Sequence, residues 1–461
     1  MESWKKVCII VSVYVILREF RPIDPFIIKY LRFLPEKYTI RTLREEVYPM
    51  SSYVSVLFIV IIFLITDYLQ YKPIIILNGL SGIISYSLLL GSPTIILLKL
   101  SQIFLMLFRA AEVAHYTYMF AKIKNKDQYQ IAISIVKTSI MIGKCSCGII
   151  AQVLISYNIS YEYLLYLSIL GMVLTTIWSL IMPPVKFSLY FYKEKESALD
   201  LFVNDSKNII QTKINESTII NLHKKNIKKY FIKMKCSEVI QKLWDDFHVA
   251  YTDANVFKWS VWWSLSLSGY VLVSHYIQLH WEEIEAHGER NSLNGAVESL
   301  TTLLSAAAIY AFGRVNGEWE KYGDILMALV AMGLGIMLYF LSLTKSLTKS
   351  YAYYIIFSCA YQIMATISSS EVAKFLKRNC YALIFGFNKL IAYILIIIFT
   401  VIIIEDKLFY SDIHQQFLIY SVYFMFLGCL FSLMAFISFR TATVTNNYRN
   451  RILDVYIYNI N

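Results

Sequence analysis

The chain has 461 residues, of which 57% are hydrophobic and only 16% are charged. Its mean hydropathy of +0.53 is too apolar for a soluble protein of this length, so we expect a protein that crosses a membrane several times. The formal net charge of +11 does not indicate nucleic-acid binding, because the basic residues gather in the connections between apolar stretches, where they determine membrane topology.

Apolar stretches long enough to cross the hydrocarbon core recur about twelve times along the chain. They cover residues 7–30, 49–66, 73–90, 95–121, 131–155, 163–183, 257–279, 293–313, 325–343, 351–373, 381–404 and 413–437. The polar stretch 186–255 separates the first six from the last six. This pattern predicts an all-α polytopic membrane protein with two six-helix bundles, residues 1–185 and residues 256–461 with a tail, which is the outline of a secondary transporter.

The first apolar stretch contains the sequence RPIDPF, from Arg21 to Phe26. No small-residue cleavage site follows the stretch, so we interpret it as the first membrane span and not as a cleaved signal peptide. The two prolines interrupt the helical hydrogen-bond ladder, which membrane helices tolerate where the backbone lines a cavity. Arg21 and Asp24 then either line a substrate path or form a structural ion pair at a kink, and the sequence leaves both open.

The fourth stretch carries Arg109, Glu112, His115 and Tyr116 inside a segment otherwise suited to hydrocarbon. Because helical steps of three and four return to one face, Glu112, His115 and Tyr116 are expected on one stripe with Met119. A carboxylate at membrane depth must have a partner and face protein or a watery cavity. Either Arg109 and Glu112 neutralise each other as a structural pair, or Glu112 lines the path of a substrate. A titrating His115 would make cation uptake fall at acidic pH, unless it is only a packing residue.

Two lysines, Lys137 and Lys144, lie within the fifth stretch. Lys137 is close enough to the expected cytoplasmic end to reach the interface, whereas Lys144 lies deeper and needs an acidic or aromatic partner. The seventh stretch contains aromatic residues that serve either as packing or, where they face the cavity, as a surface for a flat cationic ring. These residues are Trp259, Trp262, Trp263, Tyr270, His275 and Tyr276.

Basic residues also predict the orientation of the chain. If the N-terminus is cytoplasmic, the connections on that side carry most of the lysines and arginines, so both termini and the linker 186–255 are expected in the cytoplasm. Between Ser237 and Phe247, apolar residues recur at helical spacing opposite charged ones. This segment predicts a short amphipathic helix that lies on the inner leaflet or caps the bundle.

Six motifs resemble, in the same order, motifs of the reduced folate and thiamine carrier family. They are Arg21–Phe26, Thr66–Pro73, Ala110–Tyr116, Trp259–Trp263, Asn294–Glu298 and Tyr381–Asn388. The resemblance implies a major-facilitator fold, a central site between two bundles, alternating access and a B vitamin as cargo, with the plasma membrane as location. Asp67 of the second motif joins Arg21, Arg109 and Lys137 as a candidate for gating or structural ion pairs.

The charge of the site argues for one vitamin over another. Folates carry two carboxylates and favour a basic site, whereas thiamine carries a permanent positive charge and favours carboxylates and aromatic faces. By the resemblance, the folate branch has Arg where this chain has Glu112, and the thiamine branch has Glu. We therefore expect thiamine, with a reduced folate, a vitamin B6 form, another organic cation or a transport-inactive receptor as alternatives. The substrate-binding candidates are Asp24, Tyr86, Gln102, Glu112, His115, Tyr116 and Asn294.

Other classes of function find no support in the sequence. The seven histidines and seven cysteines lack the spacing of a metal site, and no nucleophile stands with a base in a catalytic pattern. We expect no enzyme activity, no cofactor and no nucleic-acid partner. The expected partners are a small-molecule substrate and the lipid bilayer.

Overall fold

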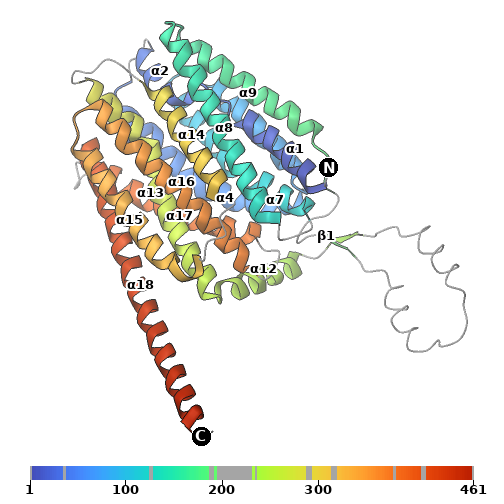
Figure 1. Ribbon diagram of the computed structural model, residues 1–461. Coiled ribbons are helices and arrows are strands. Elements are labelled where there is room, and N and C mark those ends of the chain that lie inside the picture. The colour runs from blue at the N-terminus through green and yellow to red at the C-terminus, as the bar shows by residue number, and fades with distance from the viewer. Residues whose placement is uncertain are drawn as a thin grey trace, which may run out of the picture.

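The computed structural model describes residues 3–34, 38–123, 128–185, 192–194, 231–233, 236–286, 293–312, 319–376, 381–405 and 412–458. Most of the predicted linker, including residues 186–191 and 195–230, lies outside these ranges. In Figure 1 the long helices run side by side between two ends of the molecule, and α18 extends beyond the rest at one of them.

The first half of the chain contains six spans in the described residues, two of them made of two helices each. Its elements are α1 (Ser3–Arg18), η1 (Asp24–Phe26), α2 (Ile27–Phe33), α3 (Ile40–Thr42), η2 (Leu43–Val47), α4 (Tyr48–Tyr68), α5 (Lys72–Ser87), α6 (Ile95–Ala110), α7 (Val113–Lys122), α8 (Tyr129–Ser156) and α9 (Tyr161–Ile181). The predicted spans match these helices to within a few residues, except where the first and fourth are interrupted.

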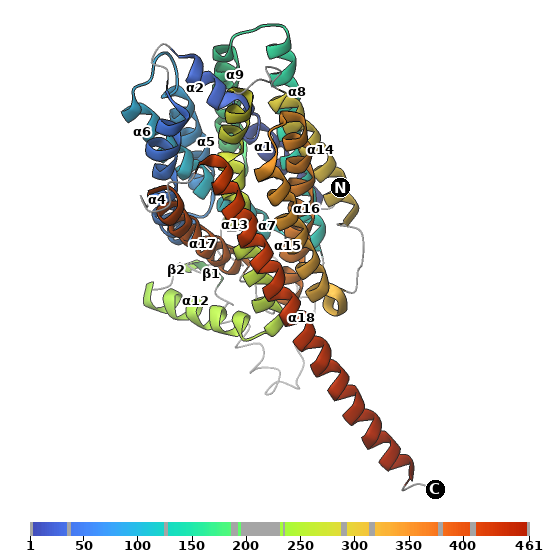
Figure 2. The same ribbon diagram turned by 90° about the vertical axis from the view of Figure 1, so that its left-hand side faces the viewer.

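The second half begins after the linker and again contains six spans in the part of the chain that is described. Its elements, with those of the linker, are β1 (Tyr192–Glu194), β2 (Phe231–Lys233), α12 (Cys236–Tyr251), α13 (Ala254–Ala286), α14 (Asn294–Phe312), α15 (Trp319–Leu343), α16 (Leu347–Phe375), α17 (Tyr381–Thr400), η4 (Val401–Glu405) and α18 (Ile413–Tyr458). The short strands β1 and β2 pair antiparallel, with Tyr192 opposite Lys233. Helix α12 covers the predicted amphipathic segment and lies across one end of the helices in Figure 2.

Two spans are interrupted near mid-length, and both carry charges at the interruption. In the first, the helix stops at Arg18 and resumes as a 3-10 turn at Asp24, as the prolines of the RPIDPF stretch require. In the fourth, α6 ends at Ala110 and α7 begins at Val113, with Glu112 at its N-cap. The second interruption has no proline or glycine; there the Glu112 amide donates to the Arg109 carbonyl at 3.3 Å, an i to i−3 bond that tightens the chain.

The two halves meet along two helix pairs, α8 against α14 and α4 against α17. At the first crossing the backbones approach closely because glycines face each other. A Cβ atom added at Gly295 would lie 2.7 Å from the carbonyl oxygen of Gly148, so only glycine fits without a shift of the helices. This contact aligns the inner faces of the two bundles.

Six helices within the described residues are long and apolar enough to cross a membrane by length and composition alone. They cover Ile40–Thr66, Ile131–Ser156, Tyr161–Ile181, Tyr322–Leu343, Leu383–Ile403 and Ile413–Arg440. The first and fourth spans are absent from this group because their interruptions leave α1 and α6 with only 16 residues each. The prediction of an all-α polytopic protein with about twelve spans in two bundles is confirmed, with the small β1–β2 pair as the one addition in the described chain.

Candidate functional site: a charged cavity between the two halves

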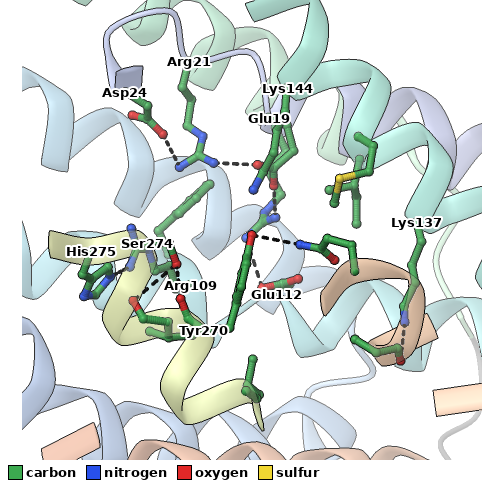
Figure 3. Close-up of a pocket in the computed structure, with 18 of the residues that line it drawn as sticks. Glu19, Arg21, Asp24, Arg109, Glu112, Lys137, Lys144, Tyr270, Ser274 and His275 are labelled. Atoms are coloured by element: carbon green, nitrogen blue, oxygen red, sulfur yellow. Dashed lines mark hydrogen bonds and ion pairs between the residues drawn. The ribbon is translucent and has the colours of Figure 1, made fainter. Parts of the chain in front are cut away.

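A cavity of about 490 Å³ lies between the two halves, at the level of the two interrupted spans. Its walls come from both halves and are rich in ionisable groups (Figure 3). Among the described residues, the lining has six basic side chains and four acidic ones. The basic ones are Arg18, Arg21, Arg109, Lys137, Lys144 and Lys389, and the acidic ones are Glu19, Asp24, Glu112 and Glu298.

The interruption of the first span carries a network of alternating charges. Arg21 pairs with Glu19 at 2.6 Å and with Asp24 at 3.0 Å, and Glu19 also contacts Arg18. The hydroxyl of Tyr86 donates to Asp24 at 2.6 Å. Each carboxylate of this network therefore has a partner, and the predicted pair of Arg21 with Asp24 is present while both line the cavity. Such pairing is required for charges held away from bulk water.

The charged residues of the fourth span do not pair with each other. Glu112 accepts from Lys389 of α17 at 3.3 Å and lies 3.7 Å from Arg18, whereas Arg109 contacts the ring nitrogen of His275 on α13. The structure thus contradicts a structural pair between Arg109 and Glu112. The interruption between α6 and α7 turns the two side chains toward different partners, and each of them bridges to the second half of the chain.

The stripe predicted on α7 is only partly correct. Tyr116 lines the cavity, but His115 is 1% exposed and lies behind the wall, with its ring between Tyr14 and Tyr116 at centroid distances of 6.0 and 4.2 Å. Neither ring nitrogen of His115 has a hydrogen-bond partner. Met119 is also fully buried. The expectation that His115 binds substrate directly is therefore not supported by its position, because α7 turns this side chain toward α1.

Three further candidates from the resemblance line the cavity: Tyr86, Gln102 and Asn294. The amide of Asn294 donates to the carbonyl oxygen of Pro25 at 3.2 Å, and its oxygen accepts from Tyr351 at 2.7 Å. Asn294 therefore joins the interrupted first span to the second half. The side chain of Asp67, near the end of α4, lies outside the described part of the structure.

The two lysines of α8 face the cavity. Lys137 donates to the Ser369 hydroxyl on α16 at 2.7 Å, so its side chain points into the protein. The expectation that it extends to the membrane interface is therefore not supported. Lys144 lies on the wall beside Glu19 in Figure 3 and makes no ion pair within 4.0 Å in the described chain. Lys137 likewise has no carboxylate within that distance. Both lysines therefore line the cavity without a carboxylate at ion-pair distance in the described chain.

Aromatic side chains of the second half complete the lining. Trp263 and Tyr270 of α13 face the cavity, and Tyr270 stacks on Tyr361 with ring centroids 3.9 Å apart. Trp259 and Trp262 are buried in the packing of the bundle. The aromatic residues of the seventh span thus divide between the two roles expected for them.

Four charged residues that line the cavity were not predicted as site residues from the sequence: Arg18, Glu19, Glu298 and Lys389. A signal for Lys389 was present, because it lies within an apolar stretch and directly follows the last motif. The rule that singles out Lys144, that a buried charge needs a function or a partner, applies equally to Lys389. Within the described residues, no three His, Cys, Asp or Glu side chains are grouped to hold a metal ion.

A second group of charges joins the halves at the end of the molecule where α2 lies. Lys29 contacts Glu285 at 2.7 Å, and Arg32 contacts Glu282 at 2.6 Å. Both basic residues belong to α2 and both acidic ones to α13. We call this group the α2–α13 cluster. It links the first half to the second beyond one end of the cavity.

Two helical bundles around a polar cavity form a fold of the major-facilitator type. The solved structure of the human organic anion transporter MFSD10 (TETRAN) has this fold, with a TM-score of 0.58, 11% identity, and coverage of 94% of this chain and 100% of that one. The profile of the family described as "Reduced folate carrier" matches residues 2–419. The chain belongs to this family, as the six motifs indicate, and it is a membrane transporter and not an enzyme.

Relatives cover nearly the whole chain. Thiamine transporter 2 of Macaca fascicularis is 28% identical over 93% of this chain and 89% of its own length. Folate transporter 1 of Caenorhabditis elegans is 27% identical over 95% and 93%, respectively. The human reduced folate transporter is 26% identical over 94% of this chain and 73% of its own. Two substrate classes are thus represented among proteins of similar distance.

Proposed function

We propose that this protein carries a B vitamin across the plasma membrane by alternating access, and that thiamine is the principal cargo. The observation that carries the proposal is the Glu112 carboxylate in the central cavity, where 29% of its side chain stays exposed. A carboxylate is the group that a permanent organic cation requires, and the aromatic side chains of Tyr116 and Tyr270 line the same cavity. Relatives named as thiamine transporters support the same cargo.

A reduced folate is the second candidate, and the balance of charge in the cavity favours it. The lining holds two more basic than acidic side chains in the described residues, and Lys137 and Lys144 lack a carboxylate in contact. A cargo with carboxylates could form charge-assisted hydrogen bonds with these two ammonium groups. Relatives named as folate transporters are consistent with this alternative.

For the orientation, the proposal follows the basic residues of the sequence: both termini and the linker are cytoplasmic. The α2–α13 cluster then lies on the extracellular side. When this cluster is formed, it holds the two halves together on the extracellular side. Alternating access requires such a closure in any state whose cavity is shut off from the extracellular medium.

Uptake by cells that express the chain tests the cargo. We expect uptake of labelled thiamine that unlabelled thiamine inhibits more strongly than folate or pyridoxine. The substitution Glu112→Gln should reduce this uptake at least tenfold, because the amide cannot neutralise the cation, while the amount of protein at the cell surface stays near normal.

Three results would count against thiamine: uptake of folate alone, no uptake of either vitamin, or undiminished thiamine uptake by Glu112→Gln. A matched loss of surface protein and uptake in that variant would instead assign Glu112 a structural role. Lys137→Gln is the companion variant, since it should impair folate uptake much more than thiamine uptake if the anionic cargo is the correct one.

A further inference from the structure

The partner of Glu112 in the cavity is a lysine from the opposite half of the chain. Lys389 lies on α17, and its ammonium is 3.3 Å from Oε2 of Glu112 and 3.4 Å from the carbonyl oxygen of Arg109. Lys389 therefore contacts both the Glu112 side chain and the backbone of the interrupted fourth span. Its positive charge lies where the positive charge of the proposed cargo would bind.

This ion pair is loosely held. Charge-assisted N–H to O contacts of good geometry measure about 2.7–2.9 Å, and both contacts of Lys389 are longer. The two side chains keep 16% and 29% exposure, respectively, so the pair opens onto the cavity. A lysine ammonium on its flexible four-carbon stem can move away without disturbing the helix that bears it.

Oxygen Oε1 of Glu112 is available to a ligand. Lys389 and Arg18 both approach Oε2, and no described residue forms a hydrogen bond or ion pair with Oε1. An incoming cation can therefore contact the carboxylate before Lys389 leaves it. Once both cations share one carboxylate, their mutual repulsion favours departure of one of them, and Lys389 can swing away on its flexible stem.

We propose that Lys389 is the resident counter-ion of Glu112, which a cationic cargo displaces, and that it thereby sets the affinity of the site. This inference rests on the proposed function. The tethered ammonium neutralises the carboxylate while the cavity is empty and competes with the cargo for it. Because the Glu112–Lys389 pair joins the two halves, its exchange for a cargo cation also removes one link between them.

Thiamine binding to the purified full-length chain tests the proposal. If Lys389 holds the carboxylate most of the time, its removal in Lys389→Gln should tighten thiamine binding roughly tenfold, since apparent affinity falls with the fraction of sites that are available. Lys137→Gln is the comparison variant for the general effect of charge, because it removes one cation from the same cavity at a lysine that makes no ion pair with Glu112. It should tighten thiamine binding by less than about threefold, well short of the effect of Lys389→Gln.

A double variant tests whether Lys389 affects thiamine binding through the Glu112 carboxylate. On the background of Glu112→Gln, the change Lys389→Gln should no longer tighten binding, because the two side chains act through one pair. Lys389→Arg provides a second test should Lys389→Gln fold poorly. A guanidinium can hold a carboxylate with two hydrogen bonds, so this variant should bind thiamine more weakly than the parent chain.

Unchanged or weaker thiamine binding in a well-folded Lys389→Gln would overturn the proposal while leaving thiamine transport intact. Equal tightening by Lys137→Gln would also overturn it, because the effect would then come from the total charge of the cavity. A parent chain that binds folate and no thiamine refutes the proposed cargo, and this inference with it.

Discussion

Among the described residues, ion pairs join the two halves of the molecule at two places, and the pairs differ in contact distance and in the balance of their charges. In the α2–α13 cluster, Arg32 and Lys29 contact their carboxylates at 2.6 and 2.7 Å, and the side chain of Glu282 is 6% exposed while that of Arg32 is 36% exposed. At the centre, Glu112 lies 3.3 Å from Lys389, and its side chain is 29% exposed. A short charge-assisted contact is stronger than a long one, so the central pair exchanges its partner more easily than the pairs of the cluster.

The balance of charge differs in the same direction. The cluster matches two basic side chains to two acidic ones, so it has no charge left for a ligand. The cavity has an excess of basic groups, and two of its lysines contact no carboxylate in the described chain. The same residue types thus form a structural link between the halves at one place and a ligand-binding site at the other, depending on contact distance and on the balance of charge.

Breaking the cluster should have the larger effect on stability. Glu282→Ala leaves Arg32 without its carboxylate and leaves Lys29 with Glu285 alone, so we expect a loss of about 1–2 kcal/mol, less than for a fully buried pair because Arg32 is 36% exposed. Thermal unfolding of the purified protein measures it. Glu45→Ala is the control, since Glu45 belongs to an exposed pair with Arg41 and should cost less than about 1 kcal/mol. Equal effects would show that burial does not distinguish the cluster.

Exchanging charges within the cluster sharpens the comparison further. Lys29→Glu alone places three carboxylates together and should reduce uptake and surface expression severely. Adding Glu285→Lys restores an opposite pair at the same positions, so we expect most of the uptake to return. Uptake per molecule at the cell surface is the measure. Failure of the double variant, with each single variant equally impaired, would argue that the cluster depends on more than charge.

The bundle architecture could be predicted because it depends on local properties of the chain. The length of an apolar stretch and the basic residues that flank it are properties of one continuous segment. The predicted limits of most spans therefore agree with helices such as α4 and α9. The interruption of the first span was foreseeable from its prolines. The interruption at Glu112 was not, since no proline or glycine stands there and the tightened turn depends on contacts of the folded protein.

Pairing inside the cavity could not be read from spacing. Arg109 and Glu112 are three residues apart, which permits contact on a regular helix, yet a turn of the backbone sends one to His275 and the other to Lys389. These partners lie on α13 and α17, more than a hundred residues away. Tyr86 and Asn294 were found only through the family resemblance, because nothing in their own neighbourhoods distinguishes them from packing residues.

The smallest effect is expected at His115, which tests how far the central site extends. From the sequence, a protonated imidazole next to Glu112 would compete with a cationic cargo, so His115→Gln should reduce the sensitivity of uptake to acid. In the structure the ring is 1% exposed, packs against Tyr14 and Tyr116, and is absent from the cavity lining. We therefore expect His115→Gln to change thiamine uptake less than about threefold at any pH between 5.5 and 8, through altered packing of Tyr116 alone. Uptake across this pH range, corrected for surface protein, gives the answer. A variant that loses the acid sensitivity of the parent chain would show that His115 titrates together with the cargo site. His115 would then belong to the site, although Tyr116 separates it from the cavity.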